Sequence, residues 1–114
     1  MELSPPTPEL AVSDLAQALD FFTSRMGFEI AWHNAAGKIA AVHHGDCGIF
    51  FRESDQDQCS GTVWIFSEDL DDTYAALIGL NAPIVDPLAE KPWGLRQFTV
   101  QDPFGNLYHF HHDT

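Results

Sequence analysis

The chain of 114 residues carries 17 acidic side chains against 5 lysines and arginines, a formal net charge of −12, and 45% of its residues are hydrophobic. This composition is typical of one globular domain with its own core, because the chain is too short for two independent domains. An acidic surface repels phosphates and anionic lipid headgroups, and no apolar run approaches the roughly 20 residues that span a bilayer, so nucleic acid and membrane are poor partners.

The cellular compartment is predicted from the N-terminal residues and the cysteines. Residues 1–8 are acidic and proline-rich, without the basic and apolar regions of a signal peptide. Cys47 and Cys59 form neither a CxxC pair nor a disulfide framework. We therefore expect free thiols and a cytoplasmic protein. The charge has two interpretations, plain solubility or attraction of a cationic ligand, and the sequence leaves both open.

The first half of the chain predicts a strand, a helix and three more strands. Leu10 and Val12 alternate with their neighbours as in a strand, and Asp14, with Gln17 three residues later, opens a helix. The apolar stripe of this helix stops at Gly27. The strand-like stretches that follow are residues 29–33, 39–44 and 48–52.

The same order of elements recurs 55 residues later. Val63 and Ile65 alternate, Asp69 precedes a second helix, and Asn81 ends it. The remaining strands are predicted at residues 84–86, 96–101 and 106–111, with a type I turn from Asp102 to Gly105. The repeat predicts an α+β fold of two βαβββ modules, about residues 7–54 and 61–112, in one domain spanning 1–114. We expect curved mixed sheets with a concave ligand face.

Strand alternation divides the side chains between a face under the helices and the concave face opposite. Phe98, Val100, Tyr108 and Phe110 are expected under the helices. On the concave face we expect Thr62, Trp64, Phe66, Gln97, Thr99, His109 and His111. Large aromatic side chains outside the core need an explanation, and two are open here: packing against another protein, or a platform for a ligand.

Six histidines make a metal site worth testing. The adjacent pairs His43–His44 and His111–His112 point to opposite faces of a strand, whereas His109 and His111 share a face at a spacing that a metal site can use. One such pair is a weak signal. The GxSxG, HExxH, GxGxxG and P-loop motifs are absent from the sequence. No catalytic residue, metal ligand or cofactor is therefore predicted.

Four short motifs stand out beyond the repeat: VSDL at 12–15, MGF at 26–28, WGLRQF at 93–98 and DPFGN at 102–106. Together they resemble the glyoxalase/bleomycin resistance protein/dioxygenase superfamily, also called the vicinal oxygen chelate fold. The resemblance extends over nearly the whole chain, and its C-terminal motifs look most like those of the bleomycin resistance proteins.

The resemblance also implies a function. Metalloenzymes of this superfamily hold a divalent ion with His or Gln in each module's first strand and Glu in each module's last strand. The matching positions here include Thr7, Thr62 and His109, which favours the drug-binding branch of the superfamily over the metalloenzymes. Members of that branch resemble acidic dimers that sequester a cationic, flat-ringed antibiotic between subunits. A non-catalytic binder of a bleomycin-type compound is therefore implied, as a homodimer with an exchanged N-terminal strand.

The ligand-binding residues are predicted to be Trp32, Trp64, Phe66, Trp93 and His109. The strand after Trp32 carries alanines where a second stacking aromatic is expected.

Two alternatives remain open. One is a divalent-metal enzyme of the glyoxalase, dioxygenase or thiol-transferase type, with ligands drawn from His43, Glu53, His109 and His111. Glu53 opens an acidic run, residues 53–57, for which the sequence offers no structural explanation. The other is a dimeric interaction module whose concave aromatic side chains are buried by protein.

Overall fold

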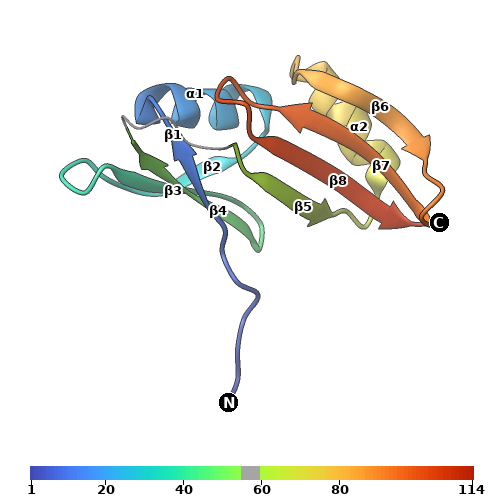
Figure 1. Ribbon diagram of the computed structural model, residues 1–114, viewed down its shortest axis with the longest axis horizontal. Coiled ribbons are helices and arrows are strands. Elements are labelled where there is room, and N and C mark those ends of the chain that lie inside the picture. Colours follow the sequence, from blue (N-terminus) through green and yellow to red (C-terminus); the bar gives the residue numbers. More distant parts are fainter. Residues whose placement is uncertain (55–59) are drawn as a thin grey trace.

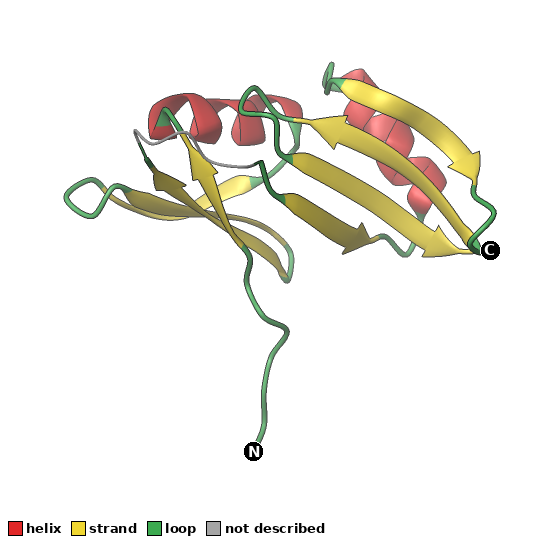
Figure 2. Cartoon of the chain, viewed as in Figure 1, coloured by secondary structure: helices red, strands yellow, loops and turns green. Residues whose placement is uncertain are grey.

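The computed structural model, which describes residues 1–54 and 60–114, contains two four-stranded mixed sheets, each with one helix on one of its faces (Figures 1 and 2). The first module consists of β1 (Glu9–Val12), α1 (Leu15–Arg25), β2 (Glu29–Asn34), β3 (Ile39–His44) and β4 (Cys47–Glu53). The second consists of β5 (Thr62–Phe66), α2 (Leu70–Gly79), β6 (Ile84–Glu90), β7 (Leu95–Gln101) and β8 (Leu107–Asp113). The predicted α+β fold of two βαβββ modules is confirmed.

The two sheets have the same topology. Their strand orders are β1-β4-β3-β2 and β5-β8-β7-β6, and only the pairs β1–β4 and β5–β8 are parallel. We call the face of each sheet that its helix does not cover the open face. Residues 1–8 extend away from the body before β1 joins the first sheet (Figure 1). Strand β8 continues to Asp113, one residue before the end of the chain.

Both helices begin where the sequence predicts. The Asp14 carboxylate accepts a hydrogen bond from the backbone N–H of Gln17 at 3.0 Å, and Asp69 accepts one from Asp72 N–H at 3.1 Å. Asn81 follows α2 with a φ of 65°, a left-handed conformation that asparagine tolerates and that stops the helix. Within the described residues, no helix is long and apolar enough to cross a bilayer.

Glu53 has a structural role that the sequence did not indicate. Its Oε2 accepts a hydrogen bond from the backbone N–H of Leu15 at 3.1 Å, which satisfies a free donor at the start of α1. The Glu53 carboxylate therefore lies at the start of α1, on the side of the sheet that the helix covers. The rest of the acidic run, together with Cys59, falls within residues 55–59, outside the described part of the chain.

One core joins both modules. The Phe22 ring on α1 contacts Phe51 of the first sheet, with centroids 4.9 Å apart, and Tyr108 of the second sheet, with centroids 5.2 Å apart. Burial of Phe98, Val100, Tyr108 and Phe110 agrees with the predicted face. The two sheets are thus held by shared apolar packing.

The DPFGN turn carries a buried polar network beside this core. The Asp102 carboxylate accepts hydrogen bonds from Tyr108 Oη at 2.7 Å and from Asn106 Nδ2 at 3.0 Å. Asn106 is almost fully buried, and its amide accepts from Gly61 N–H at 2.7 Å and donates to Ala11 O at 3.3 Å. Burial and the neighbouring carboxylate together raise the pKa of the Tyr108 phenol. The network therefore connects the turn to β1 and to the start of β5.

Replacing Asn106 with alanine is expected to lower the free energy of unfolding by about 2–3 kcal/mol. The substitution leaves Gly61 N–H, Ala11 O and one Asp102 oxygen without the hydrogen bonds that the amide makes. Urea unfolding followed by circular dichroism measures the change. The control is Asn34→Ala, which removes only an exposed bond to Gly37 N–H and should cost less than about 1 kcal/mol. Equal losses for the two variants would contradict the role of the network.

Candidate functional site

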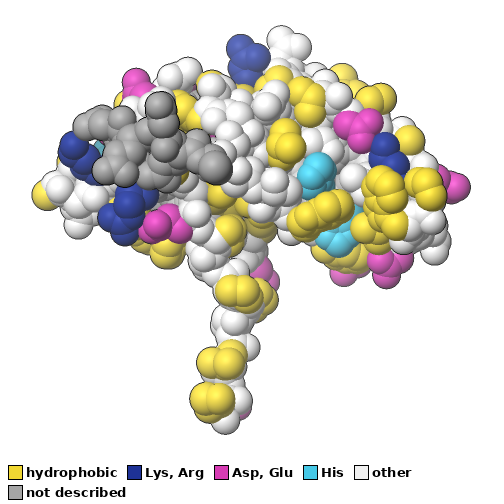
Figure 3. All heavy atoms as spheres, in the orientation of Figure 1, with side chains coloured by type: hydrophobic (Ala, Val, Ile, Leu, Met, Phe, Trp, Pro, Cys, Tyr) yellow, Lys and Arg dark blue, Asp and Glu magenta, His cyan; other side chains and the backbone are white. Residues whose placement is uncertain are grey.

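The open face of the second sheet carries a row of four side chains, one from each strand. The register places Trp64 of β5 beside His109 of β8, His109 beside Thr99 of β7, and Thr99 beside Asp86 of β6. The ring centroids of Trp64 and His109 are 4.3 Å apart, and Trp64 is still 51% exposed. Figure 3 shows hydrophobic side chains lying against histidines on this part of the molecule.

His109 is fixed by its neighbours in this row. Its Nδ1 lies 2.6 Å from Thr99 Oγ1, and Thr99 is buried, so the imidazole is held in one orientation against Trp64. Burial lowers the pKa of His109; the Asp86 carboxylate opposes this shift, and His111 adds to it. The imidazole is therefore neutral at neutral pH, and the row offers two uncharged rings in contact, with their planes tilted by 35°.

A second row lies next to the first. Phe66 pairs in register with His111, and His111 with Gln97, whose Oε1 accepts a hydrogen bond from Trp93 Nε1 at 2.9 Å. Phe66 and Trp93 are 51% and 61% exposed. His111 Nδ1 is buried and has no hydrogen-bond partner among the described residues. Four of the five predicted site residues, namely Trp64, Phe66, Trp93 and His109, thus share one face.

Trp32, the fifth predicted residue, lies on the open face of the first sheet. A bulge between Ile30 and Trp32 shifts the register so that Trp32 stands beside Ala41. Its ring contacts Phe50 of β4, with centroids 5.1 Å apart. A second aromatic side chain beside Trp32 was expected on β3. It is instead Phe50 on β4, which reaches Trp32 across the small side chain of Ala41 on β3.

Sequence reasoning did not include Phe50 and Asp86 among the side chains of these faces. It placed Gln97 and His111 there, but did not foresee that Gln97 bonds to Trp93 or that His111 contacts Trp64. The dipeptide Phe50-Phe51 contained a usable signal, because adjacent strand residues point to opposite faces and only one of them can be in the core. Asp86 was hidden by a register shift between Ile84 and Asp86, which strand alternation alone does not reveal.

Each open face holds a tryptophan and a carboxylate at opposite edges of its row. In the first sheet the row runs from Glu9 through Phe50 and Ala41 to Trp32. Glu9 pairs with Arg52 at 3.2 Å, and Asp86 of the second sheet pairs with Lys91 at 2.9 Å. Each face therefore combines aromatic surface with one carboxylate that is paired with a base.

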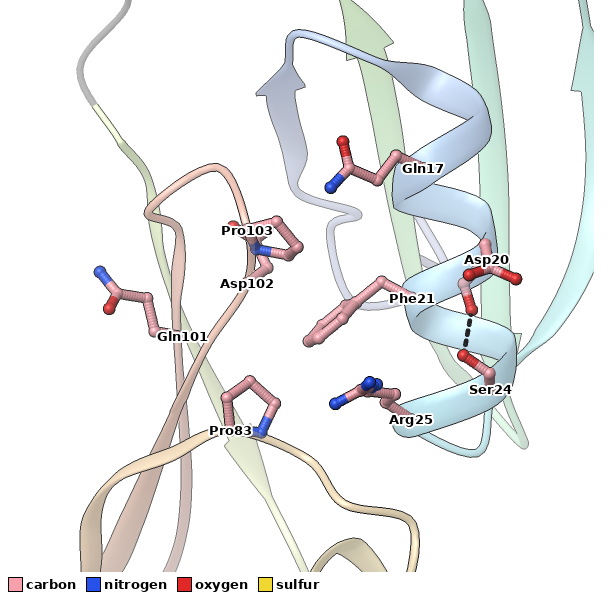
Figure 4. A pocket seen from close by; sticks show the side chains of 9 residues that line it. All are labelled: Gln17, Asp20, Phe21, Ser24, Arg25, Pro83, Gln101, Asp102 and Pro103. Carbon is pink, nitrogen blue, oxygen red and sulfur yellow. Dashed lines mark hydrogen bonds between the residues drawn. The ribbon is translucent and has the colours of Figure 1, made fainter.

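One cleft lies beside the aromatic rows, and a second lies away from them. One, of about 700 Å³, lies between residues 4–8, the start of β4 and β5, and includes Trp64 and Phe66 among its walls. The other, of about 530 Å³, lies between α1 and the β7–β8 turn (Figure 4). Its walls include Phe21, Arg25 and Gln101, and none of the five predicted site residues. Only the first cleft adjoins the aromatic rows.

The residues considered for a metal site are dispersed. His43 lies on the first sheet, with its Nε2 3.7 Å from Glu29, whereas His109 and His111 lie on the second. Among residues 1–54 and 60–114, no three His, Cys, Asp or Glu side chains are grouped so that they could hold an ion. Cys47 is a free, half-buried cysteine, and burial raises the pKa of its thiol.

Comparison with known proteins gives a family and a set of structures. The model of the Glyoxalase/Bleomycin resistance protein/Dioxygenase superfamily matches residues 5–110. The crystal structure of TioX from Micromonospora sp. ML1 is 28% identical with a TM-score of 0.79, covering 97% of this chain and 100% of that one. No curated protein matches the chain.

Two further structures show the same fold. A bleomycin-binding protein complexed with bleomycin is 20% identical with a TM-score of 0.85, covering 98% of this chain and 100% of that one. Lactoylglutathione lyase from Agrobacterium tumefaciens is 17% identical with a TM-score of 0.75, covering 97% and 95%. Binding proteins and enzymes thus share this architecture.

The Asp86→Asn substitution is expected to lower the pKa of His109 further, because it removes the carboxylate that favours the imidazolium and frees the charge of Lys91. An NMR titration of the His109 ring nitrogens measures the change. The free energy of unfolding should also depend on pH. Because folding lowers the pKa of His109, the folded state should lose stability as the pH falls below the pKa of the histidine in the unfolded chain.

The control for this titration is Asp20→Asn, which removes an exposed carboxylate on α1 and should leave His109 unchanged. An unchanged or raised His109 pKa in Asp86→Asn would show that Asp86 does not act on this ring.

Proposed function

We propose, from the fact that the chain belongs to the Glyoxalase/Bleomycin resistance protein/Dioxygenase superfamily and from the geometry of the open faces, that it is a non-catalytic protein that sequesters a cationic aromatic compound, such as a bleomycin-type antibiotic. The observation that carries the proposal is the exposed, orientated pair of Trp64 and His109 on the second sheet. Drug resistance by binding is the corresponding role.

Stacking supplies the attraction for a flat ring. A planar ligand gains from offset or edge contact with aromatic side chains, and Trp64 and Trp93 offer exposed indoles to it. Thr99 and Gln97 hold the His109 and Trp93 rings in place, so less side-chain entropy is lost when a ligand binds. The paired rings Trp32 and Phe50 offer a second stacking surface on the first sheet.

Charge supplies the preference for a cation. The chain as a whole carries −12, and the Asp86 and Glu9 carboxylates, each paired with one base, stand in the same rows as the tryptophans. Aromatic faces and carboxylates both attract cations, and the net charge speeds the encounter with one. A neutral His109 does not oppose such a ligand.

We further propose a cytoplasmic homodimer. The support for a dimer is the exposed apolar surface of the open faces and the extended segment of residues 1–8, whose Met1 and Leu3 are unburied in the single chain. A partner subunit that exchanged this segment would cover part of that surface. The unpaired, half-buried Cys47 agrees with a reducing compartment.

A metal-dependent enzyme is the second candidate. The observation that favours it is the buried, unpartnered Nδ1 of His111, on the same face as His109. The fold is shared with a lactoylglutathione lyase, so the fold does not discriminate between the two candidates.

Replacing Trp64 or Trp93 with alanine is expected to weaken the binding of a bleomycin-type ligand by about 1–3 kcal/mol while the fold is retained, because each indole is exposed and contributes stacking more than core packing. A tryptophan-fluorescence titration, repeated by calorimetry for each variant, measures the change. The control is Ile78→Ala, which truncates an equally exposed apolar side chain on α2. Unchanged affinity in both tryptophan variants would remove this face from the site.

Metal analysis of the purified protein separates the two candidates. We expect substoichiometric Ni, Zn, Mn and Fe, since the described His, Cys, Asp and Glu side chains form no group of three. A metal bound at one equivalent per chain, and lost in a His109→Ala/His111→Ala double variant, would overturn the binding proposal in favour of the enzyme.

A further inference from the structure

A groove of about 510 Å³ lies away from the tryptophans, between α2, the end of α1 and the β3–β4 turn. The two helix ends that flank it are linked, because Arg25 Nη1 donates a hydrogen bond to Asn81 O at 3.1 Å. Trp32, Trp64, Trp93 and His109 do not line the groove, and Phe66 is the only predicted site residue at its edge. The groove therefore meets the aromatic rows only at Phe66.

The floor of the groove is apolar. Met26, Phe28 and Leu77 belong to the core and close the bottom of the groove. Ala76 on α2 and Leu80, the residue that caps its C-terminus, line the side that faces solvent. Leu80 remains 39% exposed. An apolar chain that lay along these side chains would remove them from water, which is favourable in proportion to the area covered.

The rim of the groove is acidic. Glu68, Asp69 and Asp72 line it, and no lysine or arginine does. Asp69 is occupied as the cap of α2. Across the described residues, the carboxylates of Glu68 and Asp72 have neither a hydrogen bond nor an ion pair, although other acidic side chains of this protein, such as Asp71 and Asp86, are paired with a base. Two carboxylates without a basic partner therefore stand beside an apolar floor, at the N-terminal end of α2 where the helix dipole favours negative charge.

We propose that this groove is a second binding site, for a small amphiphilic amine. The ammonium group lies between Glu68 and Asp72, and the apolar tail lies over Ala76 and Leu80. Charge complementarity selects the cation, because an anionic amphiphile of the same length would meet the same carboxylates unfavourably. The site shares only Phe66 with the proposed drug-binding face and does not require the tryptophans of that face.

The test uses decylammonium below its micelle concentration, with decanoate as the anionic control of equal chain length. Calorimetry gives the affinity, and amide shifts in the NMR spectrum locate the probe. Wild-type protein is expected to bind decylammonium and not decanoate, with shifts centred on residues 66–80. Absence of decylammonium binding, equal binding of decanoate, or shifts centred on the indoles of Trp64 and Trp93 would each overturn the proposal.

Two adjacent alanines on α2 provide a matched pair of variants. Ala75 and Ala76 are both exposed, but only Ala76 lines the groove. Ala76→Phe should weaken decylammonium binding by at least about tenfold, because the ring fills the groove. Ala75→Phe makes the same change in helix propensity outside the groove, so this variant should bind decylammonium as the wild type does. Similar affinities in the two variants would place the probe elsewhere.

Charge is tested in the same way. Glu68→Gln/Asp72→Asn should weaken binding, whereas Glu90→Gln/Asp113→Asn removes two exposed carboxylates elsewhere and should not. Equal weakening would mean that only net charge matters, which overturns the site. Trp64→Ala should leave decylammonium binding intact, so failure of the drug-binding proposal and failure of this one are distinguishable.

Discussion

The buried amide of Asn106 is the interaction on which the arrangement of the sheets depends. It lies where the β7–β8 turn, the start of β5 and strand β1 meet, and it bonds to the backbone of Gly61 and of Ala11. A buried polar group must find partners within the protein, and these partners belong to both modules. The space is also filled, since a Cβ on Gly61 would lie 2.5 Å from Leu10 Cδ2. The hydrogen bonds and the close packing together therefore fix the start of β5 relative to β1.

The contact between Trp64 and His109 on the open face follows from that junction. Because the Asn106 amide holds Gly61, strand β5 starts in parallel register with β8, and Trp64 lies beside His109 rather than one residue away. A slip of one residue would turn Trp64 towards the core and Val63 and Ile65 to solvent. The Asp102 carboxylate supports this register because it fixes both Asn106 and Tyr108. A network on one side of the sheet thus positions aromatic side chains on the other.

The fold was predictable because its signals are periodic and local. Helix caps at Asp14 and Asp69, the alternation of Phe98 to Phe110 and the turn at Asp102 each depend on near neighbours, and each is confirmed. What could not be predicted depends on register between strands that are distant in sequence. The bulges before Trp32 and Asp86 decide which side chains share a row, and the bond from Leu15 to Glu53 crosses 38 residues. Neither leaves a periodic trace in the sequence.

The repeat gives these rows a further meaning. The two sheets match strand by strand, β1 with β5, β4 with β8 and β2 with β6. In the two rows, Glu9 therefore matches Trp64, Phe50 matches His109, and Trp32 matches Asp86. The two open faces therefore present the same pair of groups, an indole and a carboxylate, at opposite edges. A metal centre assembled from two modules needs ligating side chains in both, whereas a site for a flat cation needs rings and charges in complementary places. The row of the first module holds one possible ligand, Glu9, whose carboxylate is paired with Arg52, beside two aromatic rings and Ala41. This distribution agrees better with a bound aromatic cation than with a shared metal ion.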